Sequence, residues 1–234
     1  MPNAVITGAT QGIGKAVAEK LLSEGYSVAV CARSKEKLQL LEQEWNERYP
    51  TASVFTYCTD ISIRENAEGF ANETAALFPQ IDILVNNAGV FLPGELAAEP
   101  AGRLEEMIAT NLYSAYYITR HFLTGMKEAM AGHIFNMCSV ASLRAYPQGG
   151  SYSISKYALL GFSENLREEL KPYNIKVTSI CPGATWTPSW EGSGIAPERI
   201  MEAADIAEML FASSRLSIQA NVESIVMRPI KGDI

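Results

Sequence analysis

Tyr152 and Lys156 are the residues of this sequence whose types and spacing are best suited to acid–base chemistry. They stand four residues apart at the start of a segment with helical periodicity, and side chains at that spacing share one helix face. We expect the ammonium group to favour phenolate and so lower the tyrosine pKa from about 10. The pair could then transfer a proton. Coincidence is the competing interpretation, because the chain holds 10 tyrosines and the pattern is short.

A glycine-rich segment near the N-terminus is the second group with chemical meaning. The sequence GATQGIG places Gly8, Gly12 and Gly14 between a short apolar run, Asn3–Thr7, and a helical pattern that stops at Gly25. Glycines in a strand-to-helix turn let phosphates approach the backbone, and the helix N-terminus offers free N–H groups. This context predicts dinucleotide binding, with a purely structural turn as the alternative.

The residues after the second apolar run, Ser27–Ala32, indicate which dinucleotide is bound. Arg33 and Ser34 follow the run directly, and no acidic residue occurs before Glu36. A ribose 2′-hydroxyl usually meets a carboxylate at this point, whereas a 2′-phosphate favours the guanidinium group. We therefore predict NADP(H) as the cofactor, with a solvated surface arginine as the alternative.

Segments of strand and helix character alternate along the chain, and they must position these residues. Strands are expected at 3–7, 27–32, 53–57, 81–85, 133–138, 175–181 and 222–227, and the main helices at 15–24, 35–48, 61–78, 103–130, from 152 onward, and 203–211. This alternation predicts a doubly wound α/β Rossmann fold, with a central parallel sheet of about seven strands and helices on both faces. Asn111 lies inside the long helix 103–130, where asparagine is unfavourable, and this indicates a kink or a function.

Composition limits the class of protein. The 234 residues are 47% hydrophobic and 19% charged, as in an ordinary soluble globular protein, and we expect one domain spanning 1–234. The net charge of −7 argues against a nucleic-acid or membrane-surface role. The N-terminus has no signal-like character and no apolar run reaches about 18 residues, so we expect a cytoplasmic protein.

The four cysteines are far apart in the sequence, at positions 31, 58, 138 and 181. Their spacing fits neither a metal site nor a disulfide framework, so reduced, packed thiols are expected. Cys138 beside Ser139 admits a nucleophile as an alternative. Neither His121 nor His133 has an obvious pairing role with it, and this disfavours that alternative.

Six motifs occur in a fixed order along nearly the whole chain. They are Thr7-Gly8-x3-Gly12-x-Gly14, Asn86-Asn87-Ala88-Gly89, Asn111, Ser139, Tyr152-x3-Lys156 and Pro182-Gly183-x3-Thr187. Together they resemble the short-chain dehydrogenase/reductase family. The resemblance implies an NADP-dependent enzyme that reduces a small-molecule ketone or aldehyde to an alcohol, reversibly.

The resemblance also implies a role for each of four catalytic residues. Tyr152 would protonate the carbonyl oxygen, and Ser139 would hydrogen-bond that oxygen as negative charge develops. Lys156 would bind the nicotinamide ribose and lower the Tyr152 pKa, and Asn111 would hold a water that links Lys156 to solvent. The hydride would come from the nicotinamide ring. No metal is implied.

Further residues are expected at the cofactor. By resemblance, Asp60 would contact the adenine, Asn87 would lie in the cofactor loop and Thr187 would contact the nicotinamide carboxamide. The full set is Gly8, Thr10, Gln11, Gly12, Ile13, Gly14, Arg33, Ser34, Asp60, Ile61, Asn87, Ala88, Gly89, Tyr152, Lys156, Pro182, Gly183, Thr185 and Thr187. Many of them directly follow a predicted strand, so we expect them to meet at the carboxyl edge of the sheet.

Two departures from the family pattern concern the substrate and the assembly. The glycine-rich ending of the family is replaced by VMRPIKGDI, and the segment between Thr187 and the last helix is short. The short segment predicts an open pocket, and the altered ending puts the common tetramer in question. We expect a homodimer or homotetramer through the two long helices. Candidate pocket residues are Ser142, Leu143, Arg144, Tyr146, Trp186 and Trp190.

Two alternative functions remain. The 3-oxoacyl-acyl carrier protein reductases are the nearest general resemblance, but Met130 and Tyr173 stand where those enzymes have basic residues for their acidic carrier. A non-catalytic NADP-sensing binding protein is the other alternative. The complete set of proton-transfer residues argues against it, because a sensor does not need them.

Overall fold

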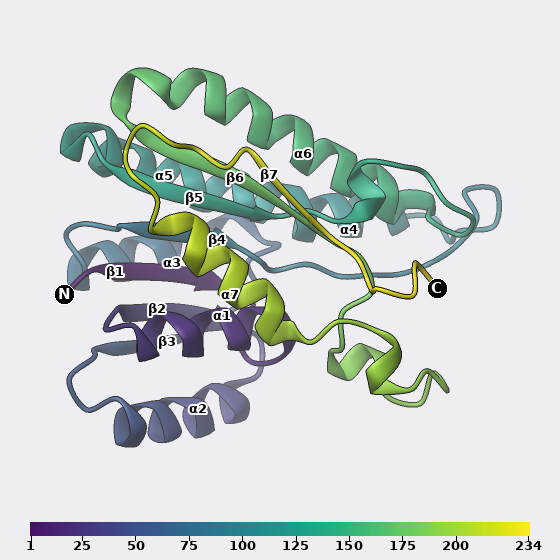
Figure 1. Ribbon diagram of the computed structural model, residues 1–234, viewed down its shortest axis with the longest axis horizontal. Helices are drawn as coiled ribbons and strands as arrows, with labels where there is room; N and C mark the ends of the chain where they lie inside the picture. The colour runs from purple at the N-terminus through teal and green to yellow at the C-terminus, as the bar shows by residue number, and fades with distance from the viewer.

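Seven parallel strands form the central sheet of the computed structural model, which describes residues 1–234 (Figure 1). The strands are β1 (Asn3–Thr7), β2 (Ser27–Ala32), β3 (Val54–Cys58), β4 (Ile83–Asn86), β5 (Gly132–Met137), β6 (Ile175–Pro182) and β7 (Ser224–Met227). Their order is β3-β2-β1-β4-β5-β6-β7, so β1 pairs with both β2 and β4. The predicted doubly wound α/β fold is confirmed. Its winding direction changes at β1, where such folds have their ligand crevice.

Seven α-helices accompany the sheet. They are α1 (Gly12–Ser23), α2 (Lys35–Arg48), α3 (Arg64–Leu77), α4 (Arg103–Ile108), α5 (Ser114–Ala129), α6 (Gly150–Leu170) and α7 (Ala203–Ser214). Helices α1, α2 and α7 pack on one face, and α3, α5 and α6 on the other. Because both faces are covered, β1, β2 and β4 are nearly continuous apolar runs rather than alternating ones. Strands β5 and β6 include polar residues, but these are buried as well. None of the helices has the length and apolar character needed to cross a bilayer.

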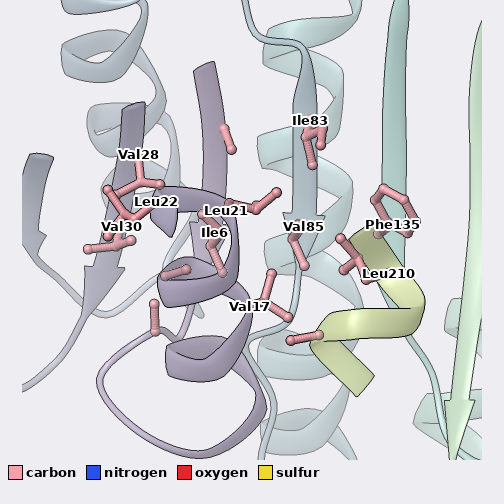
Figure 2. Packing of buried hydrophobic residues seen from close by; sticks show 14 of the residues in the cluster. Ile6, Val17, Leu21, Leu22, Val28, Val30, Ile83, Val85, Phe135 and Leu210 are labelled. Carbon is pink, nitrogen blue, oxygen red and sulfur yellow. The ribbon is translucent and has the colours of Figure 1, made fainter. Parts of the chain in front are cut away.

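Each face of the sheet has its own hydrophobic core. On the first face, Val17 and Leu21 of α1 and Leu210 of α7 pack with Ile6 and Val85 of the central strands (Figure 2). On the second face, the fully buried or nearly buried side chains of Phe70, Ile118, Phe122, Leu166 and Leu170 cover the strands. The two cores fix the strand register and so fix where each strand ends.

Some element boundaries differ from those expected. Helix α3 begins at Arg64 rather than at Ile61, because the Asp60 carboxylate accepts hydrogen bonds from the backbone N–H and the hydroxyl of Ser62, at 3.0 and 2.7 Å. Such a turn competes with the helix. Strands β3, β4 and β7 are displaced or shortened by one or two residues at their ends, where pairing with the neighbouring strand decides the boundary.

The helix expected at 103–130 is interrupted at Asn111. Between α4 and α5 lies a π-helical turn, Ala109–Tyr113, in which the N–H of Ser114 donates to the carbonyl of Ala109, five residues back. The Asn111 side chain is 1% exposed and points out of the helix toward the backbone of Val90. The expectation that this asparagine marks an irregularity of the helix is therefore confirmed, and the irregularity is a π-helical turn.

Candidate active site

A cavity of about 1050 Å³ opens at the carboxyl edge of the sheet. Gly8, Arg33, Asp60, Ser139 and Pro182 all line it, although they lie at or just after the ends of five different strands. Every residue predicted to bind the cofactor lies on this wall, and so do Tyr152, Lys156 and Ser139 of the predicted catalytic set. Asn111 lies behind the wall. The predicted convergence at this edge is confirmed.

The glycine loop is held by the segment that follows β4. The Asn87 side-chain amide donates to the carbonyls of Thr7 and Gly8, at 2.9 and 3.0 Å. A Cβ on Gly14 would overlap both this amide and the Gly8 carbonyl, so only glycine fits there. Gly8 has φ +69°, in the left-handed region that favours glycine, and a Cβ there would come within 2.9 Å of the Ala88 Cα.

Thr7 supports the same junction. Its hydroxyl oxygen accepts hydrogen bonds from the backbone N–H groups of Asn87 and Ala88, both at 3.0 Å. Thr7 entered the sequence analysis only as the first residue of a motif, and this bridging role was missed. Its position, a buried hydroxyl at the end of an otherwise apolar strand, was the available signal.

The loop after β6 covers the glycine loop from the other side. A Cβ on Gly12, which has φ +57°, would lie 2.8 Å from Cγ2 of Thr187. Gln11 precedes α1 without a side-chain cap, and the amides of the first helical turn begin at the cavity wall. Glycines that allow close approach, together with a helix N-terminus, fit the pyrophosphate of a dinucleotide.

Two cationic side chains lie at the end of β2. Arg33 is exposed on the cavity wall, and Lys37 lies on the same wall, where its ammonium donates to Oε1 of Gln11 at 2.9 Å. Ser34 caps α2 by accepting from the Lys37 N–H at 3.3 Å. This pair of cations fits a 2′-phosphate. Lys37 was missed by the sequence analysis, although its spacing of four from Arg33 was visible.

Ser139 is held in place by a short turn and by α6. It precedes the 3-10 turn Val140–Ser142, and its hydroxyl oxygen accepts from the Ala141 N–H at 3.1 Å. The hydroxyl of Ser153, on α6, donates to the Ala141 carbonyl at 2.8 Å. The turn that carries Ser139 is therefore attached to the helix that carries Tyr152 and Lys156.

Lys156 is buried beside Tyr152. The side chain is 4% exposed, its ammonium donates to the Met137 carbonyl at 2.8 Å, and its Nζ lies 5.8 Å from the Tyr152 ring centre. Burial lowers the pKa of Lys156 from 10.5 to about 8. The lysine is therefore still charged at neutral pH, although its burial disfavours the charged form.

The predicted direction of the Tyr152 pKa shift is wrong. Burial raises the pKa of the phenol to about 12, and the neighbouring Ser139 hydroxyl opposes this only in part. The prediction rested on the charge of Lys156, whereas removal of the phenol from water is the larger effect and disfavours phenolate. Tyr152 is accordingly protonated across the neutral range and can donate a proton.

Asn111 joins three segments beside Lys156. Its Oδ1 accepts from the Val90 N–H at 2.7 Å, and its Nδ2 donates to the Val90 carbonyl at 3.1 Å and to the Ser155 hydroxyl at 2.9 Å. It thus connects the π-helical turn to the segment after β4 and to α6. Asn111 makes no hydrogen bond to Lys156, whose ammonium donates to the Met137 carbonyl instead.

The remaining wall of the cavity is formed by loops. Of the six predicted pocket residues, Arg144, Tyr146 and Trp190 line it, whereas Ser142, Leu143 and Trp186 do not. Ser142 is fully buried, and its hydroxyl oxygen accepts from the Ser139 N–H at 3.1 Å. Phe91 was missed. Its ring meets that of Tyr152 edge to face, with centres 4.8 Å apart.

The end of the chain also reaches the cavity, which the sequence analysis did not predict. Arg228, Asp233 and Ile234 lie on its wall, and Figure 1 shows the chain ending on the side toward which the strands point. Arg199 holds this end by donating to the carbonyls of Lys231, Gly232 and Asp233, at 2.9 to 3.4 Å. The last residues of the chain therefore form part of the cavity wall, in addition to the segment after Thr187.

The cysteine nucleophile considered for Cys138 is not supported. The thiol is buried against Cys181, and these surroundings raise its pKa well above 9.0. His133 lies at the opposite end of β5, is hydrogen-bonded to Thr178 at 2.8 Å, and has its pKa lowered by burial to about 3. The chain also contains no group of three or more His, Cys, Asp or Glu side chains able to hold a metal ion.

Proteins of known sequence resemble this chain over nearly its full length. An uncharacterized oxidoreductase of Staphylococcus epidermidis is 29% identical over 227 residues, which cover 97% of this chain and 96% of that protein. A counterpart in Staphylococcus saprophyticus is 30% identical, with 97% of each chain covered.

Solved structures show the same architecture. An alcohol dehydrogenase from the archaeon Thermococcus sibiricus, complexed with 5-hydroxy-NADP, superposes with a TM-score of 0.90 at 29% identity, covering 98% of this chain and 97% of that one. Serine dehydrogenase from Escherichia coli superposes with a TM-score of 0.86 at 30% identity, covering 99% of this chain and 100% of that one.

The family itself is shown by a sequence model. Residues 2–195 match the model of the short chain dehydrogenases. That range contains the glycine loop, Ser139, Tyr152 and Lys156, which the fold brings to one cavity, and Asn111, which lies behind the cavity wall. The chain therefore belongs to the short-chain dehydrogenase family of oxidoreductases.

Proposed function

We propose that this protein is an NADPH-dependent reductase that converts a ketone or aldehyde to an alcohol, reversibly. The observation that carries the proposal is the meeting of Ser139, Tyr152 and Lys156 on the wall of a cavity whose other end is a glycine cradle. A proton donor, a hydrogen-bond donor for a carbonyl oxygen and a dinucleotide cradle are the parts that this reaction needs.

The cofactor would lie along the carboxyl edge of the sheet. The loop from Gly8 to Gly14 would hold its pyrophosphate, and Arg33 with Lys37 would pair with its 2′-phosphate. Lys156 would bind the nicotinamide ribose, and Thr187 the carboxamide. The alcohol dehydrogenase from Thermococcus sibiricus bound to 5-hydroxy-NADP and a serine dehydrogenase bound to NADP+ support this choice of cofactor.

The chain's own residues account for the fate of the carbonyl oxygen. When bound, NADPH supplies the hydride. The Ser139 hydroxyl, oriented by its turn, donates a hydrogen bond to the carbonyl oxygen as negative charge develops there. The phenol of Tyr152 then gives its proton to that oxygen. Its pKa of about 12 keeps it protonated at neutral pH, which suits the direction of reduction.

Proton return to Tyr152 is assigned to the polar groups behind it. Lys156 is buried beside Tyr152, and Asn111 is hydrogen-bonded to the Val90 backbone and to the Ser155 hydroxyl. In this proposal Asn111 supports the water that links Lys156 to solvent. Loss of Asn111 would slow turnover without removing the proton donor itself.

The two alternative functions are less well supported. An acyl carrier protein reductase needs basic residues for its acidic carrier, yet Met130 and Tyr173 occupy the positions expected for them, and Met130 is exposed. A binding protein without catalytic activity does not need an ordered Ser139, Tyr152 and Lys156 set. The alcohol and serine dehydrogenases among the structural neighbours also favour catalysis on small molecules.

A substrate panel tests the proposal. Ketones, aldehydes, simple alcohols and short hydroxy acids are each incubated with the protein and either phosphorylated or unphosphorylated cofactor, and the change in nicotinamide absorbance is followed. We expect turnover of at least one class with the phosphorylated cofactor, and none in Tyr152→Phe. Tight cofactor binding with no turnover across the panel would favour the sensing protein instead.

We also propose a homo-oligomer formed through α5 and α6. Tyr113, Tyr116, Ile154 and Tyr157 of this region are exposed, although they are large and apolar. An aromatic surface of this kind favours association with a second copy. Light scattering at micromolar concentration should give at least twice the chain mass, and a monomeric mass would contradict it.

A further inference from the structure

The segment between β4 and α4, residues 87–102, is attached to the start of the helix that carries Tyr152. Within it, Glu99 contacts Ser151, the residue directly before Tyr152. We propose that Glu99 is a positioning residue, whose carboxylate fixes the first turn of α6 and thereby the place of the Tyr152 phenol. The inference rests on the proposed function of Tyr152 as proton donor.

The contact is made by both oxygens of the carboxylate. Oε1 accepts from the Ser151 backbone N–H at 2.9 Å, and Oε2 accepts from the Ser151 hydroxyl. Ser151 is 2% exposed. A bidentate contact to a buried residue restrains both the backbone and the side chain at that point. Its neighbour in sequence, Tyr152, therefore starts from a fixed backbone position.

Helix α6 has no cap of its own. Its N-cap residue is Gly149, which has no side chain, and α6 begins with Gly150 and contains no acidic residue in its first turn. The first N–H groups of a helix need acceptors, and its positive dipole end favours an anion. Glu99 supplies both from 52 residues away in the sequence.

Glycine at the start of α6 leaves room for the Glu99 carboxylate. Gly150 has φ +38°, and a Cβ there would overlap Oε1 of Glu99 and the carbonyl of Gly94. The Gly94 N–H in turn donates to the Gln148 carbonyl at 3.0 Å. Two separate contacts thus hold this segment against the helix start, and the glycines permit the close approach.

The same segment touches the phenol directly. Phe91 packs edge to face against Tyr152, with ring centres 4.8 Å apart. Glu99 and Phe91 therefore restrain Tyr152 from two sides, one through the backbone and one through the ring. The hydrogen bonds from Ser151, with the charge of Arg103, hold the pKa of Glu99 below its usual value, so the carboxylate is ionised at neutral pH.

The test compares Glu99→Ala and Glu99→Gln with Glu95→Ala. Glu95 lies in the same segment, is exposed and, unlike Glu99, makes no side-chain hydrogen bond to Ser151, so it is the matched control. A small displacement of a reacting group is costly, so we expect Glu99→Ala to lower kcat about tenfold with the KM for NADPH unchanged. Glutamine can still accept from the Ser151 N–H, so Glu99→Gln should restore most of the rate.

Hydrogen exchange gives a readout that needs no substrate. The amides of residues 149–153 should exchange faster in Glu99→Ala than in the wild type or Glu95→Ala, with the rest of α6 unchanged. Full kcat in Glu99→Ala, or unchanged exchange at the start of α6, would overturn the inference. Its failure differs from failure of the proposed function, in which neither the wild type nor any variant turns over a carbonyl compound.

Discussion

The cofactor side and the substrate side of the cavity are built in different ways. On the cofactor side, backbone groups and glycines at the ends of β1 and β4 are joined by one buried threonine and one asparagine, Thr7 and Asn87. On the substrate side, Tyr146, Trp190 and Asp233 come from loops far apart in the sequence. The first side has almost no freedom to change, whereas the second can vary while the fold stays the same.

The largest effect is expected where the two sides meet, at the proton donor. Tyr152→Phe removes the phenol hydroxyl but keeps the ring that packs on Phe91. We expect kcat to fall by about 10²- to 10⁴-fold, because general acid catalysis contributes that much, with NADPH affinity retained. Steady-state assays measure kcat, and fluorescence titration with NADPH measures the affinity for the cofactor. A variant that kept a near-normal kcat would remove Tyr152 from the mechanism.

A single added methyl group in the glycine loop should disrupt the cofactor side of the cavity. In Gly14→Ala the new Cβ overlaps the Asn87 amide and the Gly8 carbonyl, so we expect about 1–3 kcal/mol of destabilisation and much weaker NADPH binding. The matched control is Gly125→Ala in α5, where nothing lies within 4 Å of the new methyl. It should keep binding and be as stable as the wild type or more so. Thermal unfolding and NADPH titration of both variants check this, and equal behaviour would contradict it.

Charge at the end of β2 should affect one cofactor and spare the other. Arg33→Ala is expected to weaken NADPH binding about tenfold and to leave NADH binding nearly unchanged, because only the former has a 2′-phosphate. Lys37→Ala should act in the same direction and less strongly, since its ammonium is shared with Gln11. Titration with both cofactors decides. An unchanged preference in Arg33→Ala would mean that this arginine is a solvated surface residue.

The titration of Lys156 should set an upper pH limit for efficient reaction with NADPH. Its pKa is lowered to about 8, so the ammonium form is complete at lower pH and is lost as the pH rises through 8. If the ammonium binds the nicotinamide ribose, kcat/KM for NADPH, which reports groups of the free enzyme, should fall above about pH 8. A profile that stayed flat to pH 10.5, the ordinary value for lysine, would contradict this assignment.

The smallest effect is expected on the substrate side. Arg199→Ala removes the donor that holds the carbonyls of Lys231, Gly232 and Asp233. Because these exposed contacts contribute little to stability, we expect a shift of about two- to threefold in KM for the carbonyl substrate. NADPH affinity should not change. An equal loss of NADPH affinity would show that the two sides of the cavity are not independent.

The contrast between the two sides also explains what the sequence could predict. Gly8, Gly12, Gly14 and Arg33 follow strands of the winding fold, so a correct alternation of strands and helices already brings them together. Their residue types are fixed by local constraints, such as the overlap a Cβ would make at Gly14. Such constraints depend on short stretches of chain and can be recognised in the sequence.

Long-range contacts could not be predicted in the same way. The approach of Asp233 to the cavity depends on how Arg199 folds the last residues back, and nothing in either segment alone indicates it. The predicted direction of the Tyr152 pKa shift was wrong for a related reason. The lysine four residues away is visible in the sequence, but the degree of burial is a property of the assembled fold.

The π-helical turn at Ala109–Tyr113 has a consequence for the phase of the helix. Each residue advances an α-helix by about 100°, so the one additional residue of this turn rotates everything after it by that angle. In an uninterrupted α-helix Met107 and Ile118, eleven residues apart, would point to within about 20° of each other, and the extra residue instead separates them by about 80°. Both are fully buried, because α4 packs against α6 whereas α5 packs against α3 and the sheet. Removing one residue from the turn would rotate α5 by about 100° relative to α4 and turn its apolar face away from the sheet. The irregularity at Asn111 thus serves as an alignment device, which lets one continuous segment face the active site at one end and the hydrophobic core at the other.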